Sequence, residues 1–168
     1  MKKEFLHELT EPFKYSHNGE FHNADVIEVK APKGNNDFFE NLQFLDSLCN
    51  KAEMRSMKNI AGVLKELELT EEQKEKAQET NSNKTDEEKA LDAYNQLLAG
   101  LEREEIKQLN ICIIELLKKS AIVDGEKKFE ASFWDGEDCL DDYDKRLLIG
   151  KYIENFTVTA QRNSKKQS

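Results

Sequence analysis

Residues 13–34, "FKYSHNGEFHNADVIEVKAPKG", contain a complete β-hairpin signal in a chain that otherwise has helical spacing. Asn18-Gly19 favours a two-residue type I′ turn, in which both central residues adopt positive φ angles. Such a turn fixes the strand register. The register predicts three pairs, which are Ser16–Phe21, Tyr15–His22 and Phe13–Ala24. We therefore expect an antiparallel hairpin with Phe13, Tyr15 and His22 on one face.

The strands on either side of this turn carry further signals. Residues 26–30, "VIEVK", are rich in β-branched side chains and end at the sequence "APKG". Pro12 suits an edge strand, where a missing N–H costs nothing. The weak alternation at Phe5, His7 and Leu9 indicates an earlier turn or edge strand. A two-stranded hairpin is not stable alone in water, so it must lie on the helices or on a neighbouring copy.

Apolar residues fall at helical spacing after residue 34. We predict a helix over residues 37–57, capped by Asp37, and a second helix over residues 58–69 that Gly62 weakens. The next segment, "TEEQKEKAQETNSNKTDEEKA" at residues 70–90, contains only two apolar residues, both alanine. Since it has no apolar face to bury, we expect a frayed helix followed by a flexible linker.

Helical spacing returns after this linker. Three helices are predicted, one from a cap at Thr85 or Asp86 to Gly100, one over residues 101–119 and one over residues 141–158. The second is the most apolar helix of the chain, and its apolar face consists of Ile106, Leu109, Cys112, Ile113, Leu116 and Leu117. Such a helix is either the central buried element or an interface, and the sequence leaves both readings open.

These elements define the predicted fold class, which is mainly α with a small N-terminal antiparallel β-hairpin (α+β). The body is expected to be a helical bundle with a mobile central linker. The predicted divisions are residues 1–69 for the hairpin and first helices, 70–90 for the linker, 91–160 for the C-terminal helical part and 161–168 for a disordered polar tail.

The net charge limits the kinds of partner that the chain can bind. The chain has 168 residues, with 34 acidic and 25 basic side chains and a net charge of −9. This argues against nucleic acid and anionic membranes as partners, since both require a basic surface. No apolar window is long enough for a membrane span and no signal peptide is evident, so we expect a soluble intracellular protein.

Cysteine and histidine spacing gives no metal or disulfide signal. None of the three cysteines has CxxC spacing or a nearby histidine, which indicates neither a zinc site nor a disulfide framework. Cys49 and Cys112 lie on apolar helix faces and suit core positions. His7, His17 and His22 all fall in the β region, without a closing ligand.

Clustered carboxylates at residues 135–144, "DGEDCLDDYD", raise the question of a calcium site. The spacing does not fit an EF-hand loop, because Leu140 takes the place of the required glycine and Arg146 that of the closing glutamate. We expect instead a helix N-terminus, whose positive dipole end favours three of these carboxylates, Asp141, Asp142 and Asp144.

Motifs for catalysis are absent from the sequence. It contains no P-loop, no GxGxxG and no serine on a nucleophile elbow. We therefore predict a protein that is not an enzyme and that uses no cofactor.

The N-terminal order of motifs can be written "LTEPFKY" followed by "GEFHNADVIEVKAP". It resembles the small tail assembly chaperones of tailed bacteriophages, in which a short N-terminal stretch of similar form leads into an α-helical body. The residues that carry the resemblance are Leu9, Pro12, Phe13, Gly19, Ile27, Val29 and Pro32. The long central linker and the segment around Trp134 depart from the shorter members of that family.

This resemblance implies a non-enzymatic role in viral tail assembly, in the host cytoplasm. Such chaperones bind the long, hydrophobic, helical tape-measure protein before the tail tube polymerises around it, and keep it soluble. The expected partner-binding residues lie on the hairpin and two helices, and are Phe13, Tyr15, Phe21, His22, Phe38, Phe39, Ile106, Ile113 and Leu117. Exposed strand edges would also allow the chain to form a homo-oligomer.

A second reading comes from a different class of protein. The chain would be a small acidic phage-encoded regulator or inhibitor that blocks a basic partner site by charge mimicry. Its support is the acidic run at residues 135–144 together with the net charge of −9, which steers a protein towards positive surfaces. Salt separates the two readings, because screening weakens charge mimicry but not apolar binding.

Overall fold

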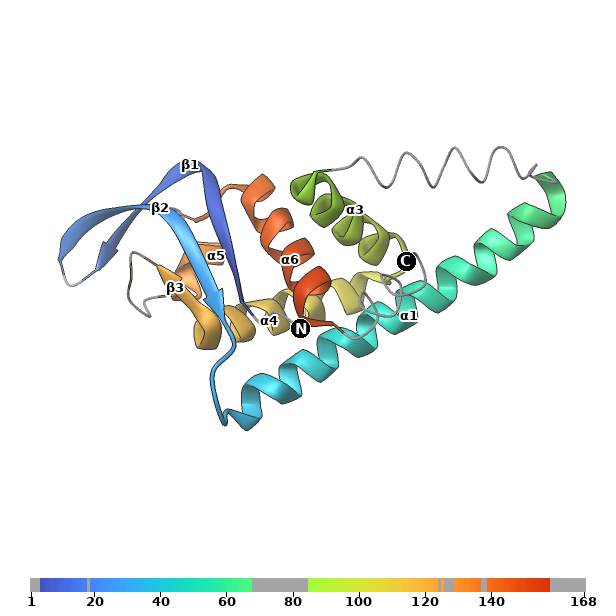
Figure 1. Cartoon of the computed structure of the whole chain (residues 1–168), viewed down its shortest axis with the longest axis horizontal. Coiled ribbons are helices and arrows are strands. Elements are labelled where there is room, and N and C mark those ends of the chain that lie inside the picture. The colour runs from blue at the N-terminus through green and yellow to red at the C-terminus, as the bar shows by residue number, and fades with distance from the viewer. Residues whose placement is uncertain are drawn as a thin grey trace.

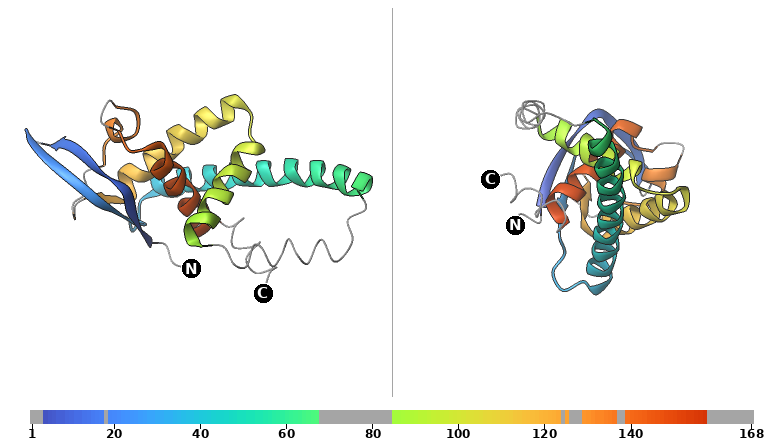
Figure 2. Two further views of the ribbon diagram at one scale, coloured as in Figure 1. Left: turned by 90° about the horizontal axis from the view of Figure 1, so that it is seen from above. Right: turned by 90° about the vertical axis from the view of Figure 1, so that its right-hand side faces the viewer.

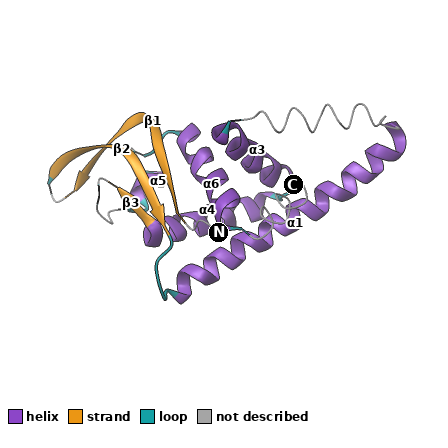
Figure 3. Cartoon of the chain, in the orientation of Figure 1, coloured by secondary structure: helices purple, strands orange, loops and turns teal. Residues whose placement is uncertain are grey.

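The computed structural model describes residues 4–17, 19–67, 85–123, 125, 129–136 and 139–157, with side chains for all of these except 17 and 57–67. It is mainly helical with a three-stranded antiparallel sheet, which confirms the predicted α+β class (Figures 1 and 3). The elements in chain order are β1 (Glu4–His17), β2 (Glu20–Lys30), α1 (Asn36–Leu67), α3 (Asp86–Ala99), α4 (Arg103–Ser120), β3 (Ala121–Val123), α5 (Ser132–Asp135) and α6 (Asp142–Phe156).

The predicted hairpin forms with the predicted register. The pairs are Phe13–Ala24, Tyr15–His22 and Ser16–Phe21. Gly19 in the turn has a φ of +79°, a left-handed conformation that glycine adopts without steric cost. Phe5, His7 and Leu9 belong to this same first strand, so no separate turn or strand precedes the hairpin.

β1 is an edge strand, as Pro12 indicated, because the strand order is β1-β2-β3. Its pairing with β2 is interrupted between Glu8 and Phe13, where four residues of β1 lie opposite Asp25 alone. The interruption is a large bulge, and bulges bend a strand and redirect its side chains. This bulge turns Thr10 towards α6.

The third strand was not predicted. β3 pairs antiparallel with β2, with Val29 opposite Ala121 and Ile27 opposite Val123. Three apolar residues directly after a helix carry no alternation from which a strand could be read. This short strand ties the end of α4 to the hairpin.

α1 is one helix of 32 residues, so the predicted division into two helices near residue 57 is wrong. No proline or turn sequence breaks the backbone there, and Gly62 is tolerated within the helix. The predicted cap is also wrong. Asn35 caps the helix, since its side-chain oxygen accepts a 3.0 Å hydrogen bond from the N–H of Phe38, while Asp37 lies in the first turn.

Replacing Asn35 with alanine is expected to lower the free energy of unfolding by about 1 kcal/mol, because an N–H at the helix start loses its acceptor. Asp37→Ala is the matched control, since it removes only the exposed ion pair with Lys119 and a favourable dipole contact, and a smaller loss is expected. Urea unfolding followed by circular dichroism measures both. A larger loss for Asp37→Ala would show that Asp37 is the cap.

The remaining helix ends follow the sequence closely. Thr85 caps α3, accepting a hydrogen bond from the N–H of Glu88, and Gly100 ends it. The linker boundary at residue 90 is therefore wrong, because α3 already begins at Asp86. Residues 70–84 of the predicted linker and the predicted tail lie outside the described residues.

α1 and α4 run antiparallel along most of their shared length. An ion pair joins Asp37 at the start of α1 to Lys119 at the end of α4, at 3.5 Å. Further along, Arg55 contacts Glu105 at 2.5 Å. These contacts show the register of the two helices, whose inner faces supply much of the core. Figure 2 shows the two helices side by side.

Two close crossings join α3 to its neighbours. α6 crosses α3 where Gly150 lies against the backbone of Ala90, and the C-terminal cap of α3, Gly100, lies against Ala52 of α1. At both places a Cβ atom on the glycine would overlap backbone atoms of the other helix. The absence of a side chain thus allows these helices to approach closely.

The inner face of the hairpin covers α6 and α5. The ring of Phe5 makes edge-on contacts with Tyr152 and Phe156, with centroids 5.5 and 5.9 Å apart. Nearer the turn, Phe13 contacts Phe133 of α5 with centroids 5.1 Å apart. The turn end of the hairpin extends beyond the helices in both Figure 1 and Figure 2.

Candidate functional site

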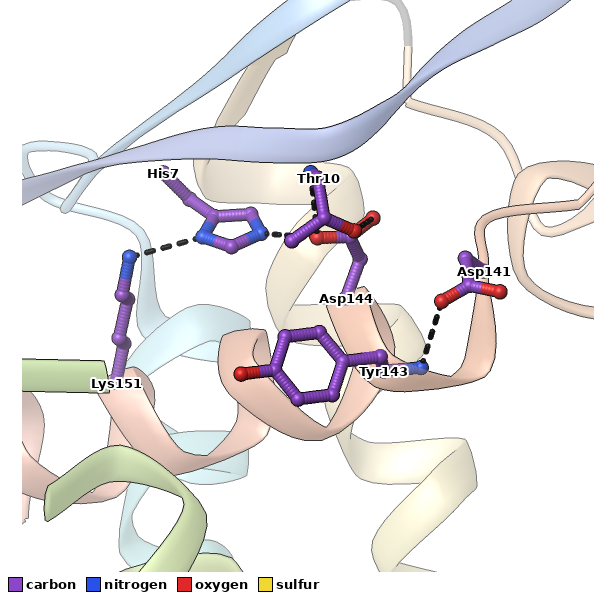
Figure 4. A network of polar contacts seen from close by, with 6 residues as sticks. All are labelled: His7, Thr10, Asp141, Tyr143, Asp144 and Lys151. Carbon is purple, nitrogen blue, oxygen red and sulfur yellow. Dashed lines mark hydrogen bonds and ion pairs between the residues drawn. The ribbon is translucent and has the colours of Figure 1, made fainter. Parts of the chain in front are cut away.

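A buried polar network joins β1 to α6. His7 is fully buried, and its Nε2 lies 2.9 Å from Oδ1 of Asp144, which is also buried. The backbone N–H and the hydroxyl of Thr10 donate to the same carboxylate, at 3.2 and 3.0 Å. Figure 4 shows these side chains meeting between the strand and the helix. Asp144 is therefore a shared acceptor for three donors of β1.

Lys151 completes the network on the other side of the imidazole ring. Its Nζ lies 2.8 Å from Nδ1 of His7. Because an ammonium group has only donors, Nδ1 must accept, and the ring proton must be on Nε2. That nitrogen then donates to Asp144. The contacts therefore require a neutral imidazole in a single tautomer, with Lys151 donating to His7 and His7 donating to Asp144.

The electrostatic surroundings agree with this protonation state. Burial lowers the pKa of His7 below its ordinary value of 6.5, and the Lys151 cation lowers it further. The hydrogen bond and charge of Asp144 act in the opposite direction without reversing the shift. Burial also lowers the pKa of Lys151, against nearby carboxylates that raise it. At neutral pH, the neutral ring thus lies between an ammonium group and a carboxylate.

This network holds β1 in place and does not present groups to a substrate, because the ring of His7 and the side chain of Asp144 are both inaccessible. Within the described residues, no group of three or more His, Cys, Asp or Glu side chains is arranged to hold a metal ion. Sequence reasoning placed Asp144 in the first turn of the last helix, as observed, but missed its contact with His7. No sequence signal links positions 137 residues apart.

Other carboxylates of the acidic run are engaged locally, which confirms the predicted helix N-terminus. Asp141 caps α6 by accepting from the N–H of Tyr143 at 3.1 Å, and Asp142 pairs with Arg146 at 2.7 Å. Among the described carboxylates of the run, Asp144 is buried and cannot be reached by a partner, whereas Asp135, Asp141 and Asp142 are exposed.

Five of the nine predicted partner-binding residues lie in the hydrophobic core, and these are Phe13, Tyr15, Phe38, Ile113 and Leu117. In this fold a partner cannot reach them. Their apolar character serves the packing of the hairpin and of the α1–α4 pair. For the helix over residues 101–119, the structure therefore favours the buried reading over most of its apolar face.

The other four predicted residues are accessible to different degrees. Phe21, near the hairpin turn, has 88% of its surface exposed. His22 is partly exposed and stacks on Tyr15, with ring centroids 5.3 Å apart. Phe39 and Ile106 are half-buried. Two of the predicted residues on the hairpin and two on the helices are thus at least partly accessible to a partner.

An exposed apolar pair that sequence reasoning did not select lies on the helices. Phe44 of α1 is 39% exposed and Ile111 of α4 is 65% exposed. The antiparallel register of α1 and α4 places the two residues at the same level of the helix pair. We call them the α1–α4 patch. In the sequence, Phe44 widens the apolar stripe of its helix, whereas Ile111 falls on the otherwise polar face of the helix over residues 101–119.

Charged residues border this patch on α4. Lys107, one turn before Ile111, pairs with Glu104 at 3.4 Å, and Glu115, one turn after it, pairs with Lys118 at 3.3 Å. Ile111 thus lies between two exposed ion pairs of its own helix, and apolar side chains bordered by charged ones are common at protein–protein contact surfaces.

The two core cysteines behave as predicted. Cys49 and Cys112 are buried, and burial raises the pKa of each thiol to about 12. Thiols in this state are poor nucleophiles, since the thiolate is the reactive form. They are packing residues of the α1–α4 pair.

Comparison with protein-family models, with curated proteins and with solved structures found no match. Among the described helices, none is both long and apolar enough to span a membrane.

Proposed function

We propose that this protein is a tail assembly chaperone of a tailed bacteriophage, which binds the tape-measure protein and keeps it soluble before the tail tube assembles. The N-terminal resemblance supplies the family. The α1–α4 patch supplies a surface of suitable chemistry, and it is the observation that carries the proposal. Phe44 and Ile111 remain exposed in a chain with a net charge of −9, where most other large apolar side chains are buried.

The chemistry of the expected partner matches this surface. A long hydrophobic helix aggregates unless its apolar face is covered, and an amphipathic helix is recognised by an apolar groove or face with a polar border. The acidic surface of the chaperone keeps the resulting complex soluble. Phe21 at the end of the hairpin supplies a second apolar contact, on the element that extends from the body.

Co-expression with a tape-measure protein from the same genome tests this proposal. We expect the full chain to keep that protein soluble and to co-purify with it at several hundred millimolar salt, because apolar contacts are not screened. The double variant Phe44→Asp, Ile111→Asp is expected to lower the affinity by about tenfold or more, since it puts charges in place of two exposed apolar side chains that the partner would bury.

The matched control is Gln43→Asp, Asn110→Asp, which adds the same charges at exposed neighbouring positions of the same helices. It should bind as the original chain does. Loss of binding in both variants would point to general charge repulsion, and steep loss of binding with salt would support the charge-mimicry reading instead. Light scattering of the chain alone, at low and high salt, measures whether it forms the expected homo-oligomer.

A further inference from the structure

We propose that His7, Asp144 and Lys151 form a pH-dependent latch that holds β1 against α6 at neutral pH and releases it on acidification. The inference does not depend on the proposed function. It rests on the geometry of a buried ring whose two nitrogens are both engaged, one by a donor-only ammonium group and the other by a carboxylate.

Protonation of His7 is incompatible with these contacts. A second ring proton would appear on Nδ1, which faces Nζ of Lys151 at 2.8 Å, so that one hydrogen bond is lost and two cations meet. The bond from Nε2 to Asp144 becomes charge-assisted, but it does not relieve the repulsion between the two cations at Nδ1. Lys151 must then move away, or β1 must lift from α6.

The charged groups around His7 come from three elements. α6 supplies Asp144 and Lys151, and α3 supplies Glu87, whose charge favours a protonated ring. Around Lys151, Glu87 and Asp86 of α3, then Asp144, and last Glu8 of β1 itself favour the charged ammonium group. From β2 the paired residue is Ile27, which is buried and apolar. Asp144 and Glu87 raise the pKa of His7, but burial and the Lys151 cation outweigh them, so the pKa is lowered.

The sign of the pH effect follows from this shift. When β1 is released, His7 is solvated and titrates near 6.5, while in the latched state it titrates lower. The released state therefore binds more protons below pH 6.5, and acidification favours it. For one proton, the opening equilibrium constant rises by up to tenfold per pH unit within this window.

Nuclear magnetic resonance of the full chain measures the latch directly. The nitrogen shifts of His7 should report the Nε2–H tautomer at pH 7.5 and a titration midpoint below 6.5. The amide of Thr10 donates to Asp144, so its hydrogen exchange, corrected for intrinsic rate, should accelerate up to tenfold per pH unit on acidification. The amide of Ile113 in α4 is the internal reference. A His7 midpoint at or above 6.5, or a Thr10 opening constant independent of pH between 7 and 5, would overturn the proposal.

Two variants separate a latch from a merely structural contact. His7→Gln keeps one acceptor and one donor but cannot titrate, so the pH dependence at Thr10 should disappear. Lys151→Met removes the cation opposite Nδ1, so the midpoint of His7 should rise and Thr10 should become less sensitive to acid. An unchanged titration midpoint of His7 in Lys151→Met would contradict the mechanism. This test does not depend on whether His7→Gln folds.

Discussion

Replacing Gly150 with alanine is expected to destabilise the chain by roughly 3 kcal/mol, although the same change normally favours a helix by about 1 kcal/mol. The added Cβ atom would overlap the carbonyl and Cα of Ala90, which are backbone atoms of α3 and cannot rotate away. α3 and α6 would have to separate, and their shared core contacts would be lost. Chemical unfolding followed by circular dichroism measures the effect.

Two further variants test the cause of this loss. Ala90→Gly in the Gly150→Ala background should not restore stability, because the overlap involves the backbone of α3 rather than its side chain. Gly34→Ala is the matched control, since Gly34 has a φ of +65° and open space around it, and only the left-handed backbone cost of about 1 kcal/mol is expected. A Gly150→Ala chain at least as stable as the original would refute the close crossing.

Asp144→Ala is expected to cost about 3 kcal/mol at neutral pH. It leaves the Nε2–H of His7 and both donors of Thr10 without their acceptor inside the fold. The donor of buried His7 then carries its full desolvation cost, whereas exposed Thr10 can turn to water. The partly buried cation on Lys151 also loses one of the carboxylates that compensate it, although Glu87 and Asp86 remain. Urea unfolding at pH 7.5 measures the loss.

Asp142→Ala is the control for this prediction, because it lies two residues away and is exposed. It removes only the surface ion pair with Arg146, so a loss of less than about 1 kcal/mol is expected. Similar losses for the two variants would show that the buried network contributes little. Asp144→Asn should fall between them, since an amide keeps one acceptor oxygen.

Local sequence was sufficient for the hairpin. The Asn-Gly turn set the register, and the pairing of Tyr15 with His22 follows directly from it. The same holds for the ends of α3 and α6, where Thr85 and Asp141 act as caps. In each case the deciding contacts join residues no more than seven positions apart, so short-range patterns contain the information.

The single helix α1 and the strand β3 were not predictable from the same patterns. Composition alone does not distinguish a continuous helix from two helices. Asn and Asp are about equally favourable as N-cap residues, so the sequence does not show that Asn35 rather than Asp37 caps α1. The three residues of β3 become a strand only because β2 offers them a partner. Here the tertiary neighbours decided the outcome.

Composition and short-range patterns were enough to predict the α+β class, the hairpin register, the net charge and the apolar faces of the helices. They did not predict which apolar residues remain exposed, because long-range packing leaves Phe44 and Ile111 outside the core and buries Ile113 and Leu117 within it. The tertiary structure also decided that His7 meets Asp144. The physical reason is that chain patterns set which face of an element is apolar, whereas burial of a given residue depends on neighbours far away in the chain.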